Sequence, residues 1–434
     1  MVMSQEADAA EFGARLKVLW ITNISLPEGR ELRGQTPTPF GGWLAGAAQS
    51  LSQRVDLSVA SLGGRLANTR PSQGERISHY EFHSDTDPRS SRKDLLRIIE
   101  SVNPVIVHIF GTEYRHARQA AELCVSGGRP FVVSVQGLVS VYAYHYKTGL
   151  PTKIQERFTL RDLVRADNIR LQQRAMRKRG IDEVATLRQA TDVIGRTTWD
   201  AACATQINPY ATYHKCNETL RGSFYEEEWT AQECERYSIF VSQGSYPIKG
   251  LHFMLEALPI ILKQFPTARL FVAGMDPTGS GSLLDRLRVT SYGKYIGELI
   301  RKHGLGDHVK FTGLLDESSM RAQYLRTHVY ALTSTIENSP NSLGEAMLLG
   351  VPTVAAAVGG VVDMAQPEID ALTYQADAPY MLAYQVCRVF KNDQLAAQLS
   401  RNARARALST HNVEQNTDSL IEIYHTVINK NQSE

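Results

Sequence analysis

The sequence predicts an α/β protein of two domains, each built around a parallel sheet of the Rossmann type. Its 434 residues exceed what one core usually holds and fit two domains of roughly 200 residues each. In both halves, short apolar runs alternate with amphipathic segments, which is typical of parallel strands covered by helices on both faces. A loop-rich stretch over residues 205–237 separates the two series.

The N-terminal half opens with a strand, a loop, a helix and a second strand. This is a βαβ unit, whose crossover is expected to be right-handed. The loop over residues 25–42 is rich in proline and glycine, and the segment after it carries small and apolar residues at helical spacing. The alternation then repeats. The expected strands are 17–23, 55–61, 105–110 and 131–135, and the expected helices are 43–53, 94–101 and 115–126.

Residues 159–190 are expected to be helical and strongly charged, and a short strand end follows at 193–195. The second half then restarts the alternation. Gly350 and Pro352 end one of its helices as a C-cap and a breaker. The last helix begins near Asn412, which has capping-box spacing to Gln415. The expected strands are 238–241, 269–273, 309–312, 329–333 and 353–357, and the expected helices are 251–264, 294–303, 317–326 and 342–349.

Charge and cysteine content narrow the class of protein. The net charge of +2 comes from 47 basic and 45 acidic side chains, which argues against a dedicated nucleic-acid binder. The five cysteines include no CxxC pair, so neither a metal site nor a disulfide framework is expected. The N-terminus lacks the apolar stretch of a signal peptide, and no run of about 20 apolar residues occurs. We therefore expect a cytoplasmic protein, with peripheral contact at the inner face of a membrane left open.

The strongest local signal is the segment 337–347 (ENSPNSLGEAM), which contains two glutamates. Glu337 directly follows a strand end, and Glu345 lies eight residues on, in the first turns of the next helix. In an open α/β sheet, ligands bind beyond the carboxyl ends of the strands, and a helix N-terminus suits a diphosphate. Two carboxylates beside that helix start can accept hydrogen bonds from sugar and ribose hydroxyls. For two glutamates taken alone, a structural interpretation is favoured over a ligand site. In that interpretation one glutamate stabilises the helix dipole and the other is an ordinary surface side chain.

The same segment resembles the E-x7-E signature of retaining glycosyltransferases of the GT-B fold, in particular glycosyltransferase family 4. The resemblance continues in order along the second half of the chain. It includes 345–354 (EAMLLGVPTV), 358–360 (VGG), 246–250 (YPIKG), 272–274 (VAG) and 309–313 (VKFTG), and more weakly 40–42 (FGG) near the N-terminus. It implies the GT-B fold, in which two Rossmann-like domains face each other across a cleft. The implied domains are an acceptor-side domain over residues 1–235 and a donor-binding domain over residues 236–411. The terminal helix, 412–434, is expected to pack back on the first domain.

The resemblance also implies roles for individual residues. Glu345 would bind the ribose hydroxyls of the donor nucleotide, and Glu337 would lie near hydroxyls of the donor sugar. Lys249 would neutralise the departing diphosphate, so Glu337 and Lys249 are the expected catalytic residues. The other expected donor-binding residues are Asn341, Ser342 and Leu343, through backbone N–H groups, and Gly313, Gly41 and Gly42.

The chain departs from the family pattern in two places. A Gly-Arg pair usually precedes the Lys-Gly element, but here 241–245 reads VSQGS. Arg196 or Arg301 can substitute for the missing cation, and Arg196 is also a candidate contact to the acceptor or the sugar. A His-Gly pair is replaced by Gln136 and Gly137. Gln136 can hydrogen-bond a sugar hydroxyl but cannot act as a base.

Four other features remain open as acceptor, sugar or metal contacts. His108 and His145 can face the cleft, although a core or loop position is the favoured interpretation for a lone histidine. Tyr144, between Tyr142 and Tyr146, can stack on a sugar ring or simply pack within its loop. The basic run Arg174–Arg179 fits a solvated helix face, with contact to an anionic membrane or to a lipid-diphosphate acceptor as the alternative. Asp85–Asp87 forms a DxD motif in a polar loop, and no metal is expected there.

These observations predict a retaining, metal-independent glycosyltransferase. The donor is expected to be a UDP-sugar, with a GDP-sugar as the rival, and it serves as co-substrate in place of any cofactor. The acceptor is a glycan, a lipid-linked glycan or a protein. Two alternatives stay open: a non-catalytic GT-B subunit that supports a partner transferase, and another enzyme on the same fold such as a sugar-nucleotide epimerase or a phosphorylase. The presence of Glu337, Glu345 and Lys249 argues against the first alternative, and the lack of a base at Gln136 argues against an epimerase.

Overall fold

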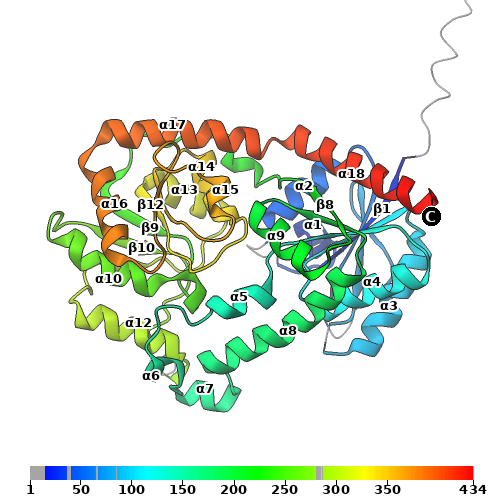
Figure 1. Cartoon of the computed structure of the whole chain (residues 1–434), viewed down its shortest axis with the longest axis horizontal. Coiled ribbons are helices and arrows are strands. Elements are labelled where there is room, and N and C mark those ends of the chain that lie inside the picture. The colour runs from blue at the N-terminus through cyan, green and yellow to red at the C-terminus, as the bar shows by residue number, and fades with distance from the viewer. Residues whose placement is uncertain are drawn as a thin grey trace, which may run out of the picture.

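Two sheets lie side by side along the long axis of the molecule (Figure 1). A computed structural model describes residues 15–36, 41–64, 67–84, 86–279, 285 and 287–433. Within these residues, the first sheet has the strand order β3-β4-β2-β1-β5-β6-β7-β8 and the second has the order β11-β10-β9-β12-β13-β14. The prediction of two Rossmann-like domains is confirmed.

Each predicted strand is present, and all strand pairs in the described residues are parallel except the short β3–β4 pair. The expected strands did not include β3, β4, β8 and β14; of these, β3, β8 and β14 are short strands at the edges of their sheets. The strands are β1 (Lys17–Thr22), β2 (Asp56–Leu62), β3 (Ser72–Gln73), β4 (Ile77–Phe82), β5 (Ile106–Phe110), β6 (Phe131–Ser134), β7 (Asp192–Gly195), β8 (Thr212–Lys215), β9 (Glu235–Val241), β10 (Arg269–Val272), β11 (Val309–Phe311), β12 (Thr327–Leu332), β13 (Thr353–Ala356) and β14 (Leu372–Tyr374).

Helices cover both sheets and connect their parallel strands. Those of the first half are α1 (Pro27–Glu31), α2 (Gly42–Ser52), α3 (Pro88–Val102), α4 (Arg115–Ser126), α5 (Val139–His145), α6 (Thr152–Gln155), α7 (Leu160–Arg165), α8 (Ile169–Gln189) and α9 (Thr198–Ile207). Those of the second half are α10 (Leu251–Leu262), α12 (Ser291–Lys302), α13 (Glu317–Arg326), α14 (Asn341–Leu348), α15 (Val361–Met364), α16 (Pro379–Lys391), α17 (Asp393–Thr410) and α18 (Val413–Ser433). Two 3₁₀ turns are also present: η1 (Gly222–Phe224) comes before β9, and η2 (Pro247–Lys249) comes before α10.

The predicted helical stretch over residues 159–190 is two helices, not one. Ala166 adopts a left-handed conformation, with φ of 48°, and so ends α7. The side chain of Asn168 accepts a hydrogen bond from the backbone N–H of Leu171 at 3.0 Å and starts α8. Helical periodicity runs through both segments, so it does not reveal the turn between them.

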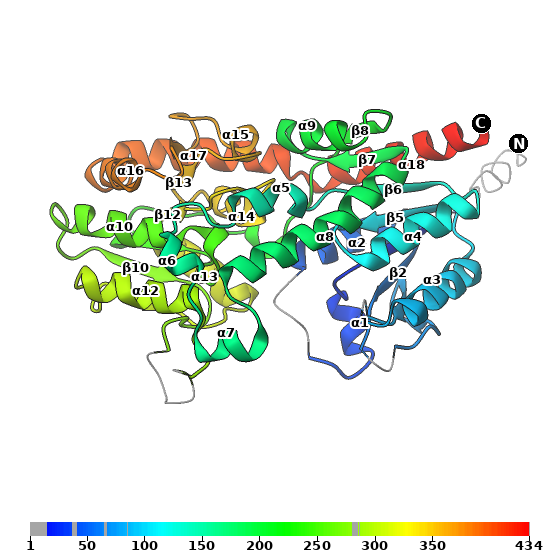
Figure 2. The same ribbon diagram turned by 60° about the horizontal axis from the view of Figure 1, so that its bottom comes forward.

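The last helix, α18, lies against the first sheet although the second sheet precedes it in the chain (Figures 1 and 2). Asn412 caps it by accepting a hydrogen bond from the N–H of Gln415 at 2.9 Å, at the spacing seen in the sequence. Tyr424 is fully buried, and its hydroxyl accepts a hydrogen bond from the indole of Trp20 at 2.9 Å. The C-terminal helix therefore completes the core of the first domain.

Buried apolar side chains form a core at each sheet, and one segment belongs to both halves. Tyr146 and Leu150, from the connection between α5 and α6, and Ile154 of α6 pack within the core cluster of the second sheet. α8 continues from this connection back to α4 beside the first sheet. The segment from α5 to α8 thus bridges the two sheets on one face of the molecule (Figure 2). None of the described helices is both long and apolar enough to cross a membrane.

Candidate active site

A cavity of about 390 Å³ lies where the carboxyl ends of strands from both sheets meet. Its walls follow β6 and β7 of the first sheet and β9 and β12 of the second, as expected for ligand sites in open α/β sheets. The lining residues are Gln136, Arg196, Val241, Ser242, Gln243, Lys249, Met320, Tyr324, Tyr330, Ala331, Leu332, Thr333, Ser334, Glu337, Ser339, Pro340, Asn341, Ser342 and Glu345.

Lys249 and Glu337 form an ion pair in this cavity, with 2.5 Å between Nζ and Oε1. The hydroxyl of Ser334 donates a second hydrogen bond to the same carboxylate oxygen at 2.7 Å. Burial by itself lowers the pKa of Lys249, but the nearby Glu337 carboxylate and tyrosine hydroxyls outweigh it and raise the pKa above 10.5. Lys249 therefore stays positively charged at neutral pH.

Tight backbone packing fixes the position of Lys249. It ends the turn η2, and the next residue, Gly250, has φ of 68°. A Cβ on Gly250 would lie 1.8 Å from the carbonyl oxygen of Thr333, so only glycine allows this approach. The hydroxyl of Thr333 in turn donates to the carbonyl of Lys249 at 2.7 Å. The Lys-Gly element is thus locked against the end of β12.

Helix α14 points its N-terminus at the cavity. Asn341 and Ser342 line the wall, and no side chain caps the helix start. The N–H of Leu343 already donates to the carbonyl of Pro340 at 2.9 Å, and its side chain is fully buried. The expected backbone contact to a diphosphate therefore fits Asn341 and Ser342 better than Leu343. A helix N-terminus and the Lys249 ammonium together make this wall attractive to an anion.

Glu345 is paired with a residue that sequence reasoning missed. Arg221, between β8 and η1, donates from Nε to Glu345 Oε1 at 2.7 Å and lies over the ring of Phe224. Burial raises the pKa of Glu345, and the adjacent Arg221 guanidinium opposes that rise. The two residues are 124 positions apart, and the loop around Arg221 has no regular pattern, so the sequence offers no signal for the pair.

Gly41 and Gly42 do not line the cavity as the structure describes it; Phe40 lies outside the described residues. Gly41 caps α2 with φ of 84°. A Cβ on Gly42 would lie 2.6 Å from Cδ of Arg221. Gly42 therefore leaves space for Arg221, which pairs with Glu345. Its effect on the cavity is indirect.

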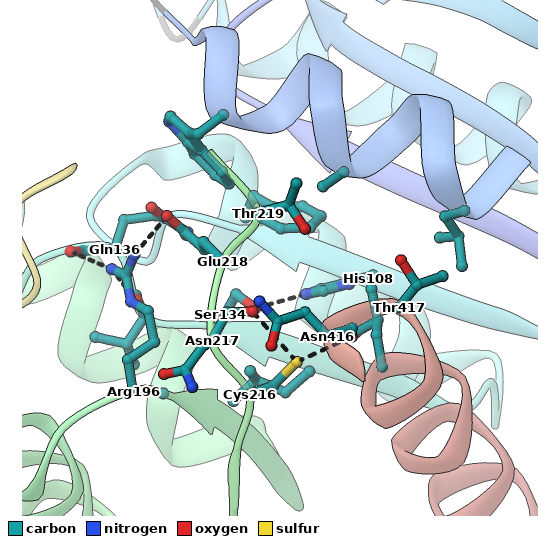
Figure 3. A pocket seen from close by; sticks show the side chains of 18 of the residues that line it. His108, Ser134, Gln136, Arg196, Cys216, Asn217, Glu218, Thr219, Asn416 and Thr417 are labelled. Carbon is teal, nitrogen blue, oxygen red and sulfur yellow. Dashed lines mark hydrogen bonds and ion pairs between the residues drawn. The ribbon is translucent and has the colours of Figure 1, made fainter. Parts of the chain in front are cut away.

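Arg196 and Gln136 reach the cavity from the first domain and meet at Glu218 (Figure 3). Arg196 Nη1 lies 2.5 Å from Glu218 Oε2, and its Nη2 donates to the backbone carbonyl of Gln136 at 3.2 Å. The amide of Gln136 donates to Glu218 Oε1 at 2.9 Å. Both residues also line a second cavity of about 50 Å³ beside α18, which is large enough for little more than water.

Four of the other predicted residues lie away from the main cavity. His108 is buried between Ser134 and Tyr424, lines only the second cavity, and has its pKa lowered by burial to about 3. It is a core histidine, the favoured interpretation from the sequence. Gly313 pairs with Gly274 through one backbone hydrogen bond beyond β11. Arg301 lines a separate groove, and the ring of Tyr144 is 74% exposed.

His145 and the DxD motif also have structural placements. The backbone carbonyl of His145 accepts a hydrogen bond from Thr335 at 3.2 Å, and partial burial lowers the pKa of its imidazole. Asp85 lies outside the described residues, and Asp87 caps α3 by accepting from the N–H of Ser90 at 3.2 Å. No group of three or more potential metal ligands occurs within the described parts of the chain.

Hydrogen bonds join the two domains beside residues that line the cavity. Thr197 donates to the side chain of Asn338 at 2.8 Å, and the backbone N–H of Thr198 donates to Asp363 at 2.7 Å. The loop that carries Glu337 also packs against a glycine pair: a Cβ on Gly359 would lie 2.0 Å from the Glu337 carbonyl oxygen. The position of Glu337 thus depends on backbone packing from a separate loop.

The second half of the chain matches a known protein family. Residues 223–406 match the family model described as glycosyl transferases group 1. An uncharacterized glycosyltransferase of Methanocaldococcus jannaschii is 24% identical over 44% of this chain and 45% of its own length. A D-inositol 3-phosphate glycosyltransferase of Salinispora arenicola is 28% identical over 41% of this chain and 38% of its own length. The chain spans about half the length of the curated relatives it matches.

Solved structures match over almost the whole chain. Sucrose-phosphate synthase from Thermosynechococcus elongatus superimposes with a TM-score of 0.67 at 15% identity, covering 96% of this chain and all of its own. The Anabaena protein HepE, in complex with UDP and glucose, gives a TM-score of 0.66 at 16% identity, covering 94% of this chain and 99% of its own. At these identities the matches establish the fold alone, which is GT-B as predicted.

Proposed function

We propose that this chain, whose second domain is a glycosyl transferases group 1 domain on a GT-B fold, is a glycosyltransferase that uses a nucleotide-sugar donor. The observation that carries the proposal is the Lys249–Glu337 pair beside the N-terminus of α14, in a cavity between the two sheets. A lysine that stays charged and a helix N-terminus supply positive potential where a diphosphate leaves. Glu337 is then within reach of the hydroxyls of a sugar attached to that diphosphate.

The donor is proposed to be a UDP-sugar, with the nucleotide held mainly by the second domain. Glu345, on α14, accepts hydrogen bonds from the ribose hydroxyls, and the diphosphate lies between Lys249 and the N–H groups of Asn341 and Ser342. Structures of HepE with UDP and with UDP-glucose, which share this fold, favour uridine over guanosine. The cation of the missing Gly-Arg element is supplied by Arg196, since Arg301 lies in a separate groove.

The proposed reaction is transfer with retention at the anomeric carbon. The acceptor hydroxyl attacks on the face from which the nucleoside diphosphate departs, and the departing phosphate takes its proton. The protein then contributes position and charge stabilisation, and no covalent intermediate is required. Gln136 lines the cavity from the first domain and is placed to hydrogen-bond a hydroxyl. The acceptor is proposed to be a glycan or a lipid-linked glycan.

We expect the reaction to proceed without a metal ion, because Lys249 and α14 provide the positive charge that a divalent cation would otherwise supply. The initial rate should be the same, within about twofold, in EDTA and in added Mg²⁺ or Mn²⁺. The measurement is release of nucleoside diphosphate from the preferred donor. A rate that falls at least about tenfold in EDTA and returns with one added cation would contradict metal independence.

Arg221 should keep Glu345 ionised for donor binding. In Arg221→Met, the buried Glu345 carboxyl loses its cation, so its pKa rises further and the group takes up a proton more readily. A protonated Glu345 is a poorer acceptor, so UDP affinity should fall about tenfold at pH 6 and recover toward pH 8. Wild type should change little over this range. Titration calorimetry with UDP at pH 6 and pH 8 measures the affinity of the variant and of wild type.

Arg221→Lys is the matched control, because it keeps the charge beside Glu345 and loses only the guanidinium geometry. Its UDP affinity should depend on pH no more than that of wild type. If Arg221→Met weakens UDP binding equally at pH 6 and pH 8, Arg221 acts by a route other than the ionisation of Glu345.

The direct test of function is a donor screen by released nucleoside diphosphate with UDP-Glc, UDP-Gal, UDP-GlcNAc, UDP-GalNAc and GDP-Man. One donor should be hydrolysed slowly by wild type and not by Glu337→Ala. If no donor is hydrolysed and none raises the melting temperature, the proposed activity is wrong. A chain that binds UDP but turns over no donor, with or without acceptors, would instead support the non-catalytic subunit.

A further inference from the structure

The segment from α6 to α8 exposes four large apolar side chains. Phe158, Leu160, Leu163 and Val164 have exposed fractions of 46%, 64%, 62% and 87%. They belong to the six-residue helix α7 and the residues just before it, which project from the face turned forward in Figure 2. We refer to these four residues as the α7 tip. Adjacent exposed apolar side chains of this size usually mark a contact surface.

A basic stripe begins five residues after the end of α7, at Arg170, on the outer face of α8. Arg170, Arg174, Arg177, Ile181 and Arg188 follow at intervals of four, three, four and seven residues, which places them on one side of the helix, and Lys178 lies at its edge. The opposite side of α8 is buried: Gln173, Met176, Gly180 and Glu183 face inward. The stripe is therefore held outward by the packing of α8.

Most charges of the stripe lack an acidic partner. Within the described residues, Arg174, Lys178 and Arg188 form no ion pair, and Arg177 lies over the exposed ring of Tyr144, 5.7 Å from its centroid. Arg170 alone pairs with an acid, Glu156. The whole chain has a net charge of only +2, so this excess of positive charge is local.

A groove of about 740 Å³ continues the same surface from α7 to α12. Phe158, Leu160 and Leu163 form one side, and Lys294 and Arg301 stand on the other. Neither cation forms an ion pair within the described part of the chain. The α7 tip thus lies between cations of α8 and cations of α12.

We infer that this surface binds a bilayer that contains anionic phospholipids, with the α7 tip entering the headgroup layer and the cations contacting lipid phosphates. Apolar side chains flanked by lysine and arginine are the signature of interfacial membrane contact. The four apolar side chains of the α7 tip form too small a patch for a stable protein interface. They are sufficient for shallow insertion into the headgroup layer when cations without acidic partners lie on both sides of them. The inference is independent of the proposed donor chemistry.

The test is flotation of the full chain with vesicles, in the absence of substrates. One vesicle is phosphatidylcholine alone, and the other contains about one third phosphatidylglycerol. Wild type should float with the anionic vesicles and not with the neutral ones, and binding should weaken as salt is raised. Wild type that floats with neither vesicle, or equally with both, would overturn the inference.

Two variants and a control separate the parts of the surface. Arg174→Glu/Lys178→Glu changes the stripe, and Leu163→Ser/Val164→Ser changes the α7 tip. Each should lower vesicle affinity at least about tenfold. The control, Lys391→Glu/Arg401→Glu, makes the same charge change on α16 and α17, along the opposite edge of the molecule (Figure 1), and should bind within about twofold of wild type.

UDP affinity, measured without vesicles, distinguishes a membrane-binding surface from a surface that takes part in donor binding. All four proteins should bind UDP with equal affinity, because the changed residues lie outside the cavity that contains Lys249 and Glu337. Variants that float like wild type, or a stripe variant that loses UDP binding while still floating, would overturn the assignment of this surface to lipid. Failure of the donor screen would leave the vesicle result unaffected.

Discussion

Lys249→Met should reduce nucleotide-sugar turnover about 10²- to 10³-fold, the effect of removing one group that stabilises charge in a transition state. The lysine pairs with Glu337 and lines the same cavity as the N-terminus of α14, where a departing diphosphate is proposed to lie. Its raised pKa keeps it charged throughout the neutral pH range in which turnover would be measured. The measurement is the initial rate of nucleoside diphosphate release at saturating donor.

The same substitution should also destabilise the fold, which has to be separated from the loss of rate. The Lys249 and Glu337 side chains are only 19% and 8% exposed, so removing the cation leaves a mostly buried carboxylate whose charge is no longer balanced. Breaking such a pair costs about 3–5 kcal/mol. The double variant Lys249→Met/Glu337→Gln has no such charge and should recover most of that stability.

The double variant is therefore expected to recover stability without recovering activity. Thermal unfolding should return toward the wild-type midpoint, while nucleoside diphosphate release stays as low as in Lys249→Met. If turnover recovers together with the melting temperature, the lysine has only a structural role. In that case the positive charge that acts on the donor must come from another group.

Gly359→Ala adds a single methyl group next to the site and, like an alanine at Gly250, should be strongly disruptive. Gly359 has φ of 49°, and an added Cβ would lie 2.0 Å from the backbone carbonyl oxygen of Glu337. A left-handed conformation costs a non-glycine residue roughly 1–2 kcal/mol, and the contact must also displace one of the two loops. We expect a loss of about 3 kcal/mol or more. For a domain of this size, that lowers the melting temperature by about 6–12 °C.

Gly304→Ala separates conformational strain from the steric contact. Gly304 follows α12 with φ of 65°, but an added Cβ would have no neighbour within 4 Å. This control should lose only about 1–2 kcal/mol and keep normal donor turnover. Gly359→Ala should lose both stability and turnover, because Glu337 moves with its backbone. If the two substitutions had equal effects on stability and turnover, the loop that carries Glu337 would have to move aside without a measurable loss of stability.

The sequence identified the elements that carry the site, because they obey local rules. Apolar strands alternating with helices reveal parallel sheets, and the carboxyl ends of parallel strands meet at one edge. Glu337 after β12, Lys249 after β9 and Asn341 at the start of α14 could therefore be expected to converge. The structure places all three around one cavity. Their roles in binding and catalysis remain predictions for the experiments above.

Sequence alone did not reveal the partners of these residues. Arg221 pairs with Glu345 across 124 residues, and Glu218 joins Arg196 to Gln136 from the same irregular loop. His108 follows the pattern of a residue at a strand end, yet α18 covers it and brings Tyr424 to its ring. No local pattern encodes a contact made by a segment hundreds of residues away.

The sequence by itself thus determined the fold class, the order of strands along the chain and the position of the Lys249 and Glu337 elements. Each depends on periodicity, helix and turn signals or strand ends, which act over a few residues. Tertiary structure alone decided which ions pair, which histidine is buried, and that α7 and α8 are separate helices with outward-facing apolar and basic side chains. Those outcomes depend on which surfaces pack together, and packing is set by the whole chain.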